Sequence, residues 1–284
     1  VRSLEHTASV AVAARPNPFE SLHVYARAAV VIDATTGSVL YEQKADTPLP
    51  LASITKIAMA LSVLDAMPQD ETIELPYSIH DSDNGDLLPA GTEWKVKNLL
   101  DYTLVVSSND GAEELARAAS PHVHKKYPDS PESDATIWRM NKIAESIPAP
   151  TLKFLNASGL DISSAATGGV GSARDVAALA LYATREYPQR FSASARREVH
   201  LYGSEGQIDA ENTNNILSSI PGLALSKTGY TYAAGGNLVI VFRPDGVHEI
   251  VAVILGSTLS GRFSEMQKLI RASMIYLLNE REAS

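Results

Sequence analysis

Short apolar runs near both ends of the chain predict strands, and the long stretch between them has mainly helical spacing. Near the N-terminus, residues 28–33 (AAVVID) and 38–42 (SVLYE) are apolar and rich in β-branched side chains. A Thr-Gly turn separates the two runs, so together they predict a β-hairpin. Residues 1–24 are mixed in character and contain Pro16 and Pro18, and we expect them to form an N-terminal arm.

The middle of the chain predicts helices separated by polar loops. Helices are predicted over residues 53–67, 99–118, 135–146 and 176–187. The first is apolar on most sides, which is typical of a helix buried all round. The second is interrupted by a polar segment at residues 107–111, and Ser172 is a favoured N-cap residue for the fourth. Residues 68–98 and 121–134 are polar, and we expect loops there.

The character of the chain changes after about residue 210, where strand-like runs return. Strands are predicted over residues 222–227, 237–243 and 249–256, followed by an amphipathic helix over 263–279. An isolated two-stranded hairpin is not stable, so the strands from both ends of the chain must share one sheet. We therefore expect a sheet subdomain made of residues 25–52 and 211–284, and a helical subdomain made of residues 53–210.

Composition excludes several classes of function. The chain has 284 residues, a net charge of −9 and no cysteine. The negative charge argues against a nucleic-acid partner, and the absence of cysteine excludes disulfides and thiolate chemistry. No apolar run is long enough to span a bilayer. The acidic cluster at residues 81–86 lacks the remaining ligands of a calcium loop, and His122 and His124 have no carboxylates at ligand spacing, so no metal site is predicted.

Ser53 and Lys56 form the only Ser-x-x-Lys in the sequence, at the start of the first predicted helix. Positions i and i+3 share a helix face with about 5–6 Å between their Cβ atoms, so the lysine amine can reach the serine hydroxyl. Serine becomes a nucleophile when a base accepts its proton, and lysine can do this once burial or a neighbouring cation lowers its pKa. Taken alone, the pattern also fits an ordinary buried helix.

Ser107 and Asn109 form a Ser-x-Asn motif between two apolar helical segments. A hydroxyl at this place can pass a proton to a leaving amine, and an amide can hold an amide of the substrate. Ser82-Asp83-Asn84 has the same spacing but lies in a polar loop, and a catalytic group needs rigid support, so we favour Ser107 and Asn109. The alternative interpretation is a helix break capped by serine and asparagine.

Lys227, Thr228 and Gly229 occur once as Lys-Thr-Gly, at the end of a predicted strand. The ammonium group can lower the pKa of the other lysine and attract a carboxylate, which Thr228 can also bind. Gly229 lets a substrate approach the strand edge closely. The backbone N–H of Tyr230 can join that of the nucleophilic serine in an oxyanion hole. An ordinary strand end is the alternative interpretation.

Three motifs in this order are typical of penicillin-binding proteins and class A β-lactamases. The sequence resembles the D-alanyl-D-alanine carboxypeptidases of the low-molecular-weight penicillin-binding protein group. The resemblance extends over roughly residues 28–280. It is carried by residues 28–61, 99–116 (LLDYTLVVSSNDGAEELA), 138–141, 154–160 (FLNASGL) and 225–239 (LSKTGYTYAAGGNLV).

The resemblance implies an α/β fold with a five-stranded, mainly antiparallel sheet flanked by helices and a large all-α insertion. It implies a serine peptidase in which the D-Ala-D-Ala end of a peptidoglycan stem peptide acylates Ser53, D-Ala leaves and water hydrolyses the acyl-enzyme. β-Lactams would acylate the same serine and leave slowly, and no metal or organic cofactor is implied. Arg262 resembles an arginine that the family places near the substrate carboxylate.

The resemblance also carries expectations about location. It implies a periplasmic or extracytoplasmic protein, with any membrane anchor outside this chain. Many relatives carry a C-terminal β-rich domain and a membrane-binding tail, and we expect both to be absent or removed here.

Three alternatives remain from the sequence. A class A β-lactamase needs a glutamate that activates the deacylating water, and the expected stretch, FLNASGLD, has no Glu-x-x-x-Asn. A sensor domain of the same fold would bind a β-lactam without turnover. A D,D-endopeptidase that cuts peptide crosslinks would carry the same motifs as a carboxypeptidase.

Overall fold

A computed structural model describes residues 16–76 and 88–283 of the chain. Its centre is an antiparallel sheet with the strand order β12-β13-β14-β1-β2. The strands are β1 (Ala28–Asp33), β2 (Ser38–Gln43), β12 (Leu223–Thr231), β13 (Gly235–Phe242) and β14 (Ile250–Ser257). Strands from the two ends of the chain are joined where β1 pairs with β14. The five-stranded sheet predicted from the sequence is thereby confirmed.

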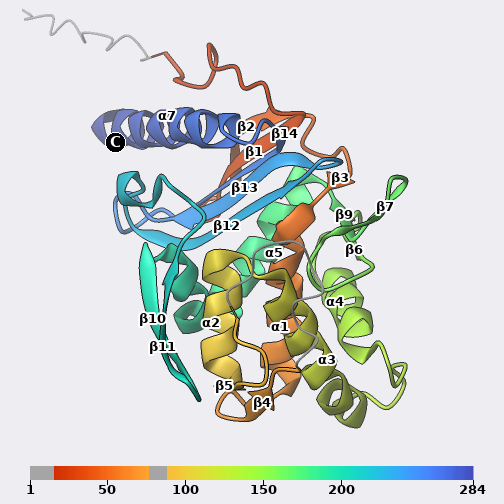
Figure 1. Ribbon diagram of the computed structural model, residues 1–284. Coiled ribbons are helices and arrows are strands. Elements are labelled where there is room, and N and C mark those ends of the chain that lie inside the picture. The colour runs from red at the N-terminus through yellow and green to blue at the C-terminus, as the bar shows by residue number, and fades with distance from the viewer. Residues whose placement is uncertain (1–15, 77–87, 284) are drawn as a thin grey trace, which may run out of the picture.

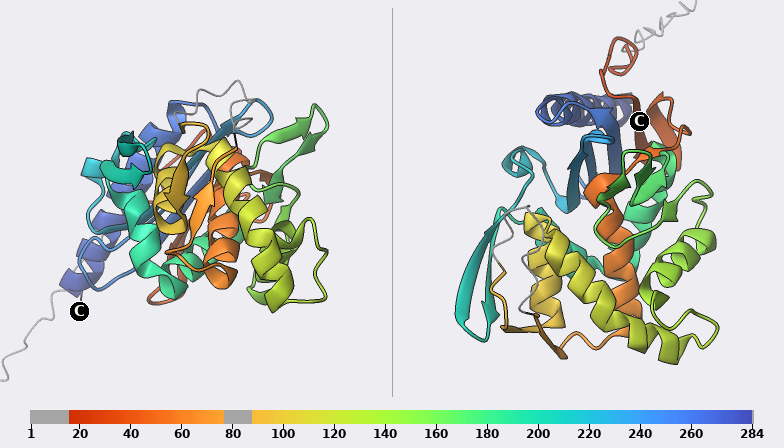
Figure 2. Two further views of the ribbon diagram at one scale, coloured as in Figure 1. Left: turned by 60° about the horizontal axis from the view of Figure 1, so that its bottom comes forward. Right: turned by 45° about the vertical axis from the view of Figure 1, so that its right-hand side comes forward.

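Each face of this sheet packs against a different layer of helices. Successive residues of a strand point to opposite faces, so Ala29 and Val31 lie in a core with α7 (Gly261–Ala283), whereas Ala28 and Val30 lie in a core with the helical block. Figure 1 shows α7 along one side of the sheet and the other helices on the opposite side, and the right-hand view of Figure 2 shows the same layers. The sheet is thus covered by helices on both faces.

The helical block is built around α1 (Lys56–Ala66). This helix continues a short 3₁₀ turn (Ala52–Thr55), and all its residues from Lys56 to Leu64 are buried. The surrounding helices are α2 (Val96–Val106), α3 (Asn109–Lys126), α4 (Ala135–Ser146), α5 (Ala173–Glu186) and the short α6 (Pro188–Phe191). In Figure 1, α1 runs through the middle of this group, as expected for a helix that is apolar on most sides.

The insertion also contains short strands where the sequence indicated loops or gave no clear pattern. β4 (Thr72–Glu74), β5 (Glu93–Lys95), β10 (Glu198–Gly203) and β11 (Gly206–Glu211) form one small sheet. β3 (Leu49–Pro50), β6 (Lys153–Phe154) and β9 (Gly169–Gly171) form a second, and β7 (Asp161–Ser163) pairs with β8 (Ala166–Thr167). These strands are short and mostly exposed on one face, so they lack the apolar runs that identify the central sheet.

The loop expected over residues 121–134 is partly helical, because α3 continues through Pro121 to Lys126. Val123 is fully buried, and the Ser120 hydroxyl contacts that of Thr136 in α4 at 3.1 Å. Packing against α4 therefore outweighs the helix-breaking tendency of the proline. Among the described helices, none is both long and apolar enough to cross a membrane.

Asp101 in α2 provides a prediction about stability. Burial raises the pKa of its carboxyl to about 6, against the opposing effect of Arg190, whose guanidinium lies 3.8 Å away. A carboxyl with a raised pKa in the folded state favours folding while it is protonated, and this contribution is lost as the pH rises from 3.8 to about 6. Asp101→Asn should lack this loss and gain about 2–3 kcal/mol over the wild type at neutral pH.

Urea denaturation of both proteins across this pH range measures the difference. Asp70→Asn is the matched control, because Asp70 is exposed and its ion pair with Lys97 lies on the surface. The same pH dependence in wild type and Asp101→Asn would contradict the prediction.

Candidate active site

Ser53 lies in a tightly held turn where the sheet meets the helical block. The preceding residue, Ala52, has a left-handed backbone with φ of 49°, which is costly for a residue with a Cβ. Asn237, fully buried in β13, stabilises this turn by donating from Nδ2 to the carbonyls of Pro50 and Leu51, both at 3.0 Å. The central sheet therefore fixes the position of the nucleophile predicted from the sequence.

Lys56 is fully buried and its amine lies between three oxygen atoms. Its Nζ is 2.9 Å from Ser53 Oγ, 2.7 Å from Asn109 Oδ1 and 2.8 Å from the carbonyl oxygen of Ser158. The helical i, i+3 spacing thus brings amine and hydroxyl into hydrogen-bond contact, and the other two acceptors hold the amine in place. At this distance a neutral amine can accept the serine proton.

Ser107 and Asn109 flank the junction between α2 and α3. Ser107 ends α2 with a left-handed backbone, φ 67°, and the Ser108 side chain caps α3 by accepting from the N–H of Gly111 at 2.7 Å. The chain reverses sharply here, so Ser107 and Asn109 both reach the site. Ser82-Asp83-Asn84, the alternative Ser-x-Asn, and the acidic cluster at residues 81–86 lie outside the described residues.

Lys227 in β12 is the second buried lysine of the site. Its Nζ donates to Ser107 Oγ at 2.7 Å and to the carbonyl of Thr228 at 2.9 Å. Burial lowers its pKa well below the usual value, and the positive charges of Lys56 and Arg262 lower it further. The two lysines therefore act on each other electrostatically, and each contacts one serine hydroxyl.

Gly229 brings the edge of the central sheet against the nucleophile turn. A Cβ at this position would lie 2.9 Å from the carbonyl oxygen of Leu51 and 3.1 Å from the backbone nitrogen of Ser53. Such contacts are too close for most side chains, so glycine permits the approach. The next residue, Tyr230, follows on the same edge strand with its ring partly exposed. The backbone nitrogens of Ser53 and Tyr230 thus belong to two segments in contact.

Arg262 is the second residue of α7 and lies against this strand. It is 7% exposed, and its Nη1 donates to the carbonyl of Gly229 at 2.7 Å. Burial lowers its pKa to about 10, an effect that Tyr230 partly offsets. Arg262 therefore supports the strand directly and adds positive charge close to Lys227.

Three residues of this site were not identified from the sequence. The Ser158 carbonyl accepts from Lys56, the Thr213 hydroxyl lies 2.6 Å from that of Thr228, and Asn237 supports the turn of Ser53. Ser158 lies within the FLNASGL segment, so its place in a recognisable segment was a signal that it contributes to the site. Asn237 likewise lies within the LSKTGYTYAAGGNLV segment, whereas Thr213 carries no local signal, because its contacts depend on how distant segments fold together.

Comparisons with known proteins identify the family of this chain. A model of the D-alanyl-D-alanine carboxypeptidase family matches residues 11–258. A D-alanyl-D-alanine endopeptidase of Pseudomonas aeruginosa is 29% identical over 84% of this chain and 74% of its own length. The D-alanyl-D-alanine carboxypeptidase DacB2 of Mycobacterium tuberculosis is 26% identical over 82% of this chain and 75% of its own.

The solved structures agree with the family match. Penicillin-binding protein D2 of Listeria monocytogenes in its cefotaxime-bound form superposes with a TM-score of 0.75 and 27% identity, covering 92% of this chain and all of that one.

Proposed function

The chain belongs to the family of D-alanyl-D-alanine carboxypeptidases, and on this premise we propose that it removes the terminal D-Ala of peptidoglycan stem peptides through an acyl-enzyme on Ser53. The observation that carries the proposal is the 2.9 Å contact between Ser53 Oγ and the buried amine of Lys56. Enzymes that use serine as a nucleophile need a base within hydrogen-bond reach of the hydroxyl. The chain is accordingly a serine peptidase that needs no cofactor for this step.

Acylation can be written with the residues of the site. Lys56, as the neutral amine, accepts the proton of Ser53, whose Oγ attacks the carbonyl between the two D-Ala residues. The backbone N–H groups of Ser53 and Tyr230 stabilise the oxyanion that forms. The C–N bond then breaks, and the hydroxyl of Ser107, which contacts Lys227, relays to the leaving amine the proton that Lys56 took from Ser53. Lys56 is thereby a neutral amine again.

The leaving D-Ala carries the substrate carboxylate, which needs positive charge and a hydrogen-bond donor. Lys227 and the Thr228 hydroxyl lie one residue apart on the edge of the sheet. Arg262 adds charge behind them, and Asn109 lies where it can hold the amide of the acyl group. Hydrolysis then repeats the sequence in reverse, with water in place of the departed amine and Lys56 again accepting the proton.

β-Lactams are proposed as covalent inhibitors that acylate Ser53 and leave slowly. A class A β-lactamase uses a glutamate to activate the water that hydrolyses the acyl-enzyme. At this site the group that contacts Lys56 from the FLNASGL segment is the backbone carbonyl of Ser158, which cannot act as such a base. Glu113 contacts the same loop, but its carboxylate accepts from the backbone N–H of Ser158 at 3.0 Å. The cefotaxime-bound structure of the Listeria protein supports β-lactam binding here.

Cleavage of peptide crosslinks is the second candidate activity. Two relatives that are each 29% identical to this chain, from Pseudomonas aeruginosa and Escherichia coli, are named D-alanyl-D-alanine endopeptidase. The two reactions differ only in the amine that leaves. It is the amine of free D-Ala in the carboxypeptidase reaction, and the side-chain amine of the neighbouring stem peptide in the endopeptidase reaction. An extracytoplasmic place of action, at the cell wall, follows from either substrate.

A direct assay separates these activities. The protein is incubated with a diacetyl-Lys-D-Ala-D-Ala peptide, with a crosslinked muropeptide dimer and with a fluorescent penicillin. Release of D-Ala together with a stable penicillin label is expected. Cleavage of the dimer without D-Ala release would replace the carboxypeptidase with the endopeptidase. A stable label with no turnover of either peptide would indicate a sensor, and rapid loss of the label would indicate a β-lactamase.

A further inference from the structure

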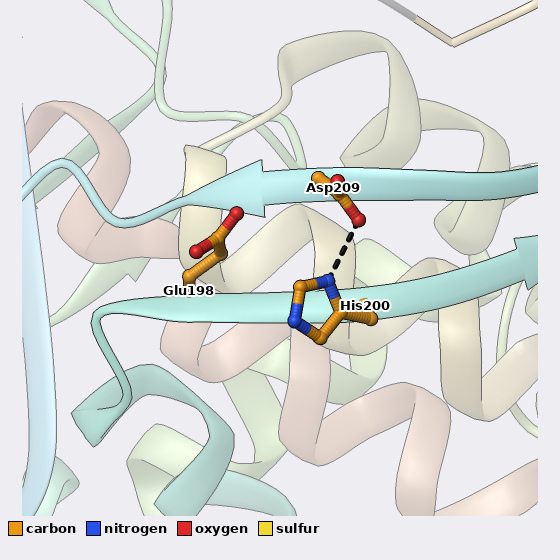
Figure 3. A group of neighbouring side chains, drawn as sticks. All are labelled: Glu198, His200 and Asp209. Carbon is orange, nitrogen blue, oxygen red and sulfur yellow. Dashed lines mark hydrogen bonds and ion pairs between the residues drawn. The ribbon is translucent and has the colours of Figure 1, made fainter.

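The hairpin of β10 and β11 carries a group of side chains that the catalytic proposal does not use. His200 is directly opposite Asp209, and Glu198 is directly opposite Glu211. Residues two apart on a strand share a face, so these four side chains lie on the same side of the hairpin. Figure 3 shows Glu198 and His200 on one strand and Asp209 on the neighbouring strand.

Three of these side chains converge closely enough to share one ion. One ligand atom from each of Glu198, His200 and Asp209 lies within 4.8 Å of the other two, and all three residues are exposed. His200 Nδ1 lies 2.7 Å from Asp209 Oδ1. In the described part of the chain neither Glu198 nor Glu211 has an ion-pair partner, so the face presents more negative charge than the single imidazole can balance.

Two other histidines of the chain provide a comparison. His122 pairs with Glu71 at 3.0 Å, and His248 pairs with Asp245 at 2.7 Å. Neither pair has a third ligand close enough, and among residues 16–76 and 88–283 the group at His200 is the only one of its kind. A single His–carboxylate contact is therefore a common feature of this surface, whereas the additional carboxylate is specific to the hairpin.

We propose that Glu198, His200 and Asp209 bind a divalent transition-metal ion of the Zn²⁺ type, with water completing the coordination. Imidazole and carboxylate are ligands that Zn²⁺ accepts, and three protein ligands plus water is one of its usual arrangements. Ca²⁺ and Mg²⁺ prefer oxygen ligands, and Ca²⁺ takes six to eight of them, so neither suits this set. The bound ion links β10 to β11 across the hairpin.

Calorimetric titration of the full chain with ZnCl₂ tests the proposal. The wild type should bind one Zn²⁺ per chain and should not bind MgCl₂ at the same concentration. His200→Ala and Glu198→Gln should each weaken Zn²⁺ binding by about tenfold or more. His248→Ala removes an equivalent histidine from a pair without a third ligand, and it should bind as the wild type does.

The variants also separate this site from the catalytic one. His200 and Glu198 are exposed on the hairpin, so both variants should fold, give the wild-type circular dichroism spectrum and release D-Ala at the wild-type rate. Wild-type Zn²⁺ affinity in His200→Ala, or the absence of any binding to the wild type, would overturn the proposal. Equal loss in His200→Ala and His248→Ala would show diffuse surface binding instead, which would also overturn it.

Discussion

Ser53→Ala is expected to abolish both D-Ala release and covalent labelling by a fluorescent penicillin. Loss of the nucleophile in a serine hydrolase typically reduces turnover by about 10³-fold or more, leaving only what the rest of the site contributes. Here the remaining groups would still bind the peptide, because Lys227, Thr228 and the backbone of the edge strand are unchanged. A rise in KM is therefore not expected to account for the loss.

The matched control is Ser62→Ala. Ser62 lies further along α1, is fully buried and donates to the carbonyl of Ala58 at 2.9 Å. Removing its hydroxyl tests whether loss of a neighbouring serine hydroxyl, two turns into the helix that follows Ser53, disturbs the site. Gel electrophoresis of the labelled proteins and an assay of released D-Ala give both readouts. Penicillin labelling that persists in Ser53→Ala would mean that the nucleophile is another residue.

The parts of the fold that could be predicted from the sequence are those whose signal is local. The strands β1, β13 and β14 are continuous apolar runs, and α4 begins and ends at the predicted residues. Ser53 and Lys56 are three residues apart on one helical turn, so the contact between them follows from spacing alone. Ser107 and Asn109 could be preferred over residues 82–84 because they lie between buried segments.

The remaining features depend on contacts between distant segments, which no local pattern encodes. Thr213 lies in an irregular segment and reaches the site because its N–H donates to the carbonyl of Val105 at 3.2 Å. The sequence suggested that Arg262 lies near the substrate carboxylate, but its hydrogen bond to the carbonyl of Gly229 depends on how α7 packs against β12. The β10–β11 hairpin is polar and exposed on one face, and its pairing is visible only in three dimensions.

Lys56→Arg and Lys56→Met are the variants that test which group is the base. Arginine keeps a positive charge and can still donate to Ser53, Asn109 and Ser158, but it does not lose its proton in proteins and so cannot accept one. If Lys56 is the base, Lys56→Arg should slow acylation by about 10²–10⁴-fold, the usual contribution of general-base catalysis. Lys142→Arg, on the exposed surface of α4, is the control for the same exchange.

Lys56→Met separates loss of the base from loss of charge. Methionine fills a similar volume but removes both the amine and its repulsion of Lys227. Because Lys56 is one of the charges that lower the pKa of Lys227, this pKa should rise in Lys56→Met and remain lowered in Lys56→Arg. The rate of penicillin acylation against pH measures both effects. Slow acylation in both variants, with a shifted pH profile only for Lys56→Met, supports Lys56 as the base. Near-wild-type acylation by Lys56→Arg would contradict this assignment. Lys56 would then only hold Ser53 in position, and another residue would be the base.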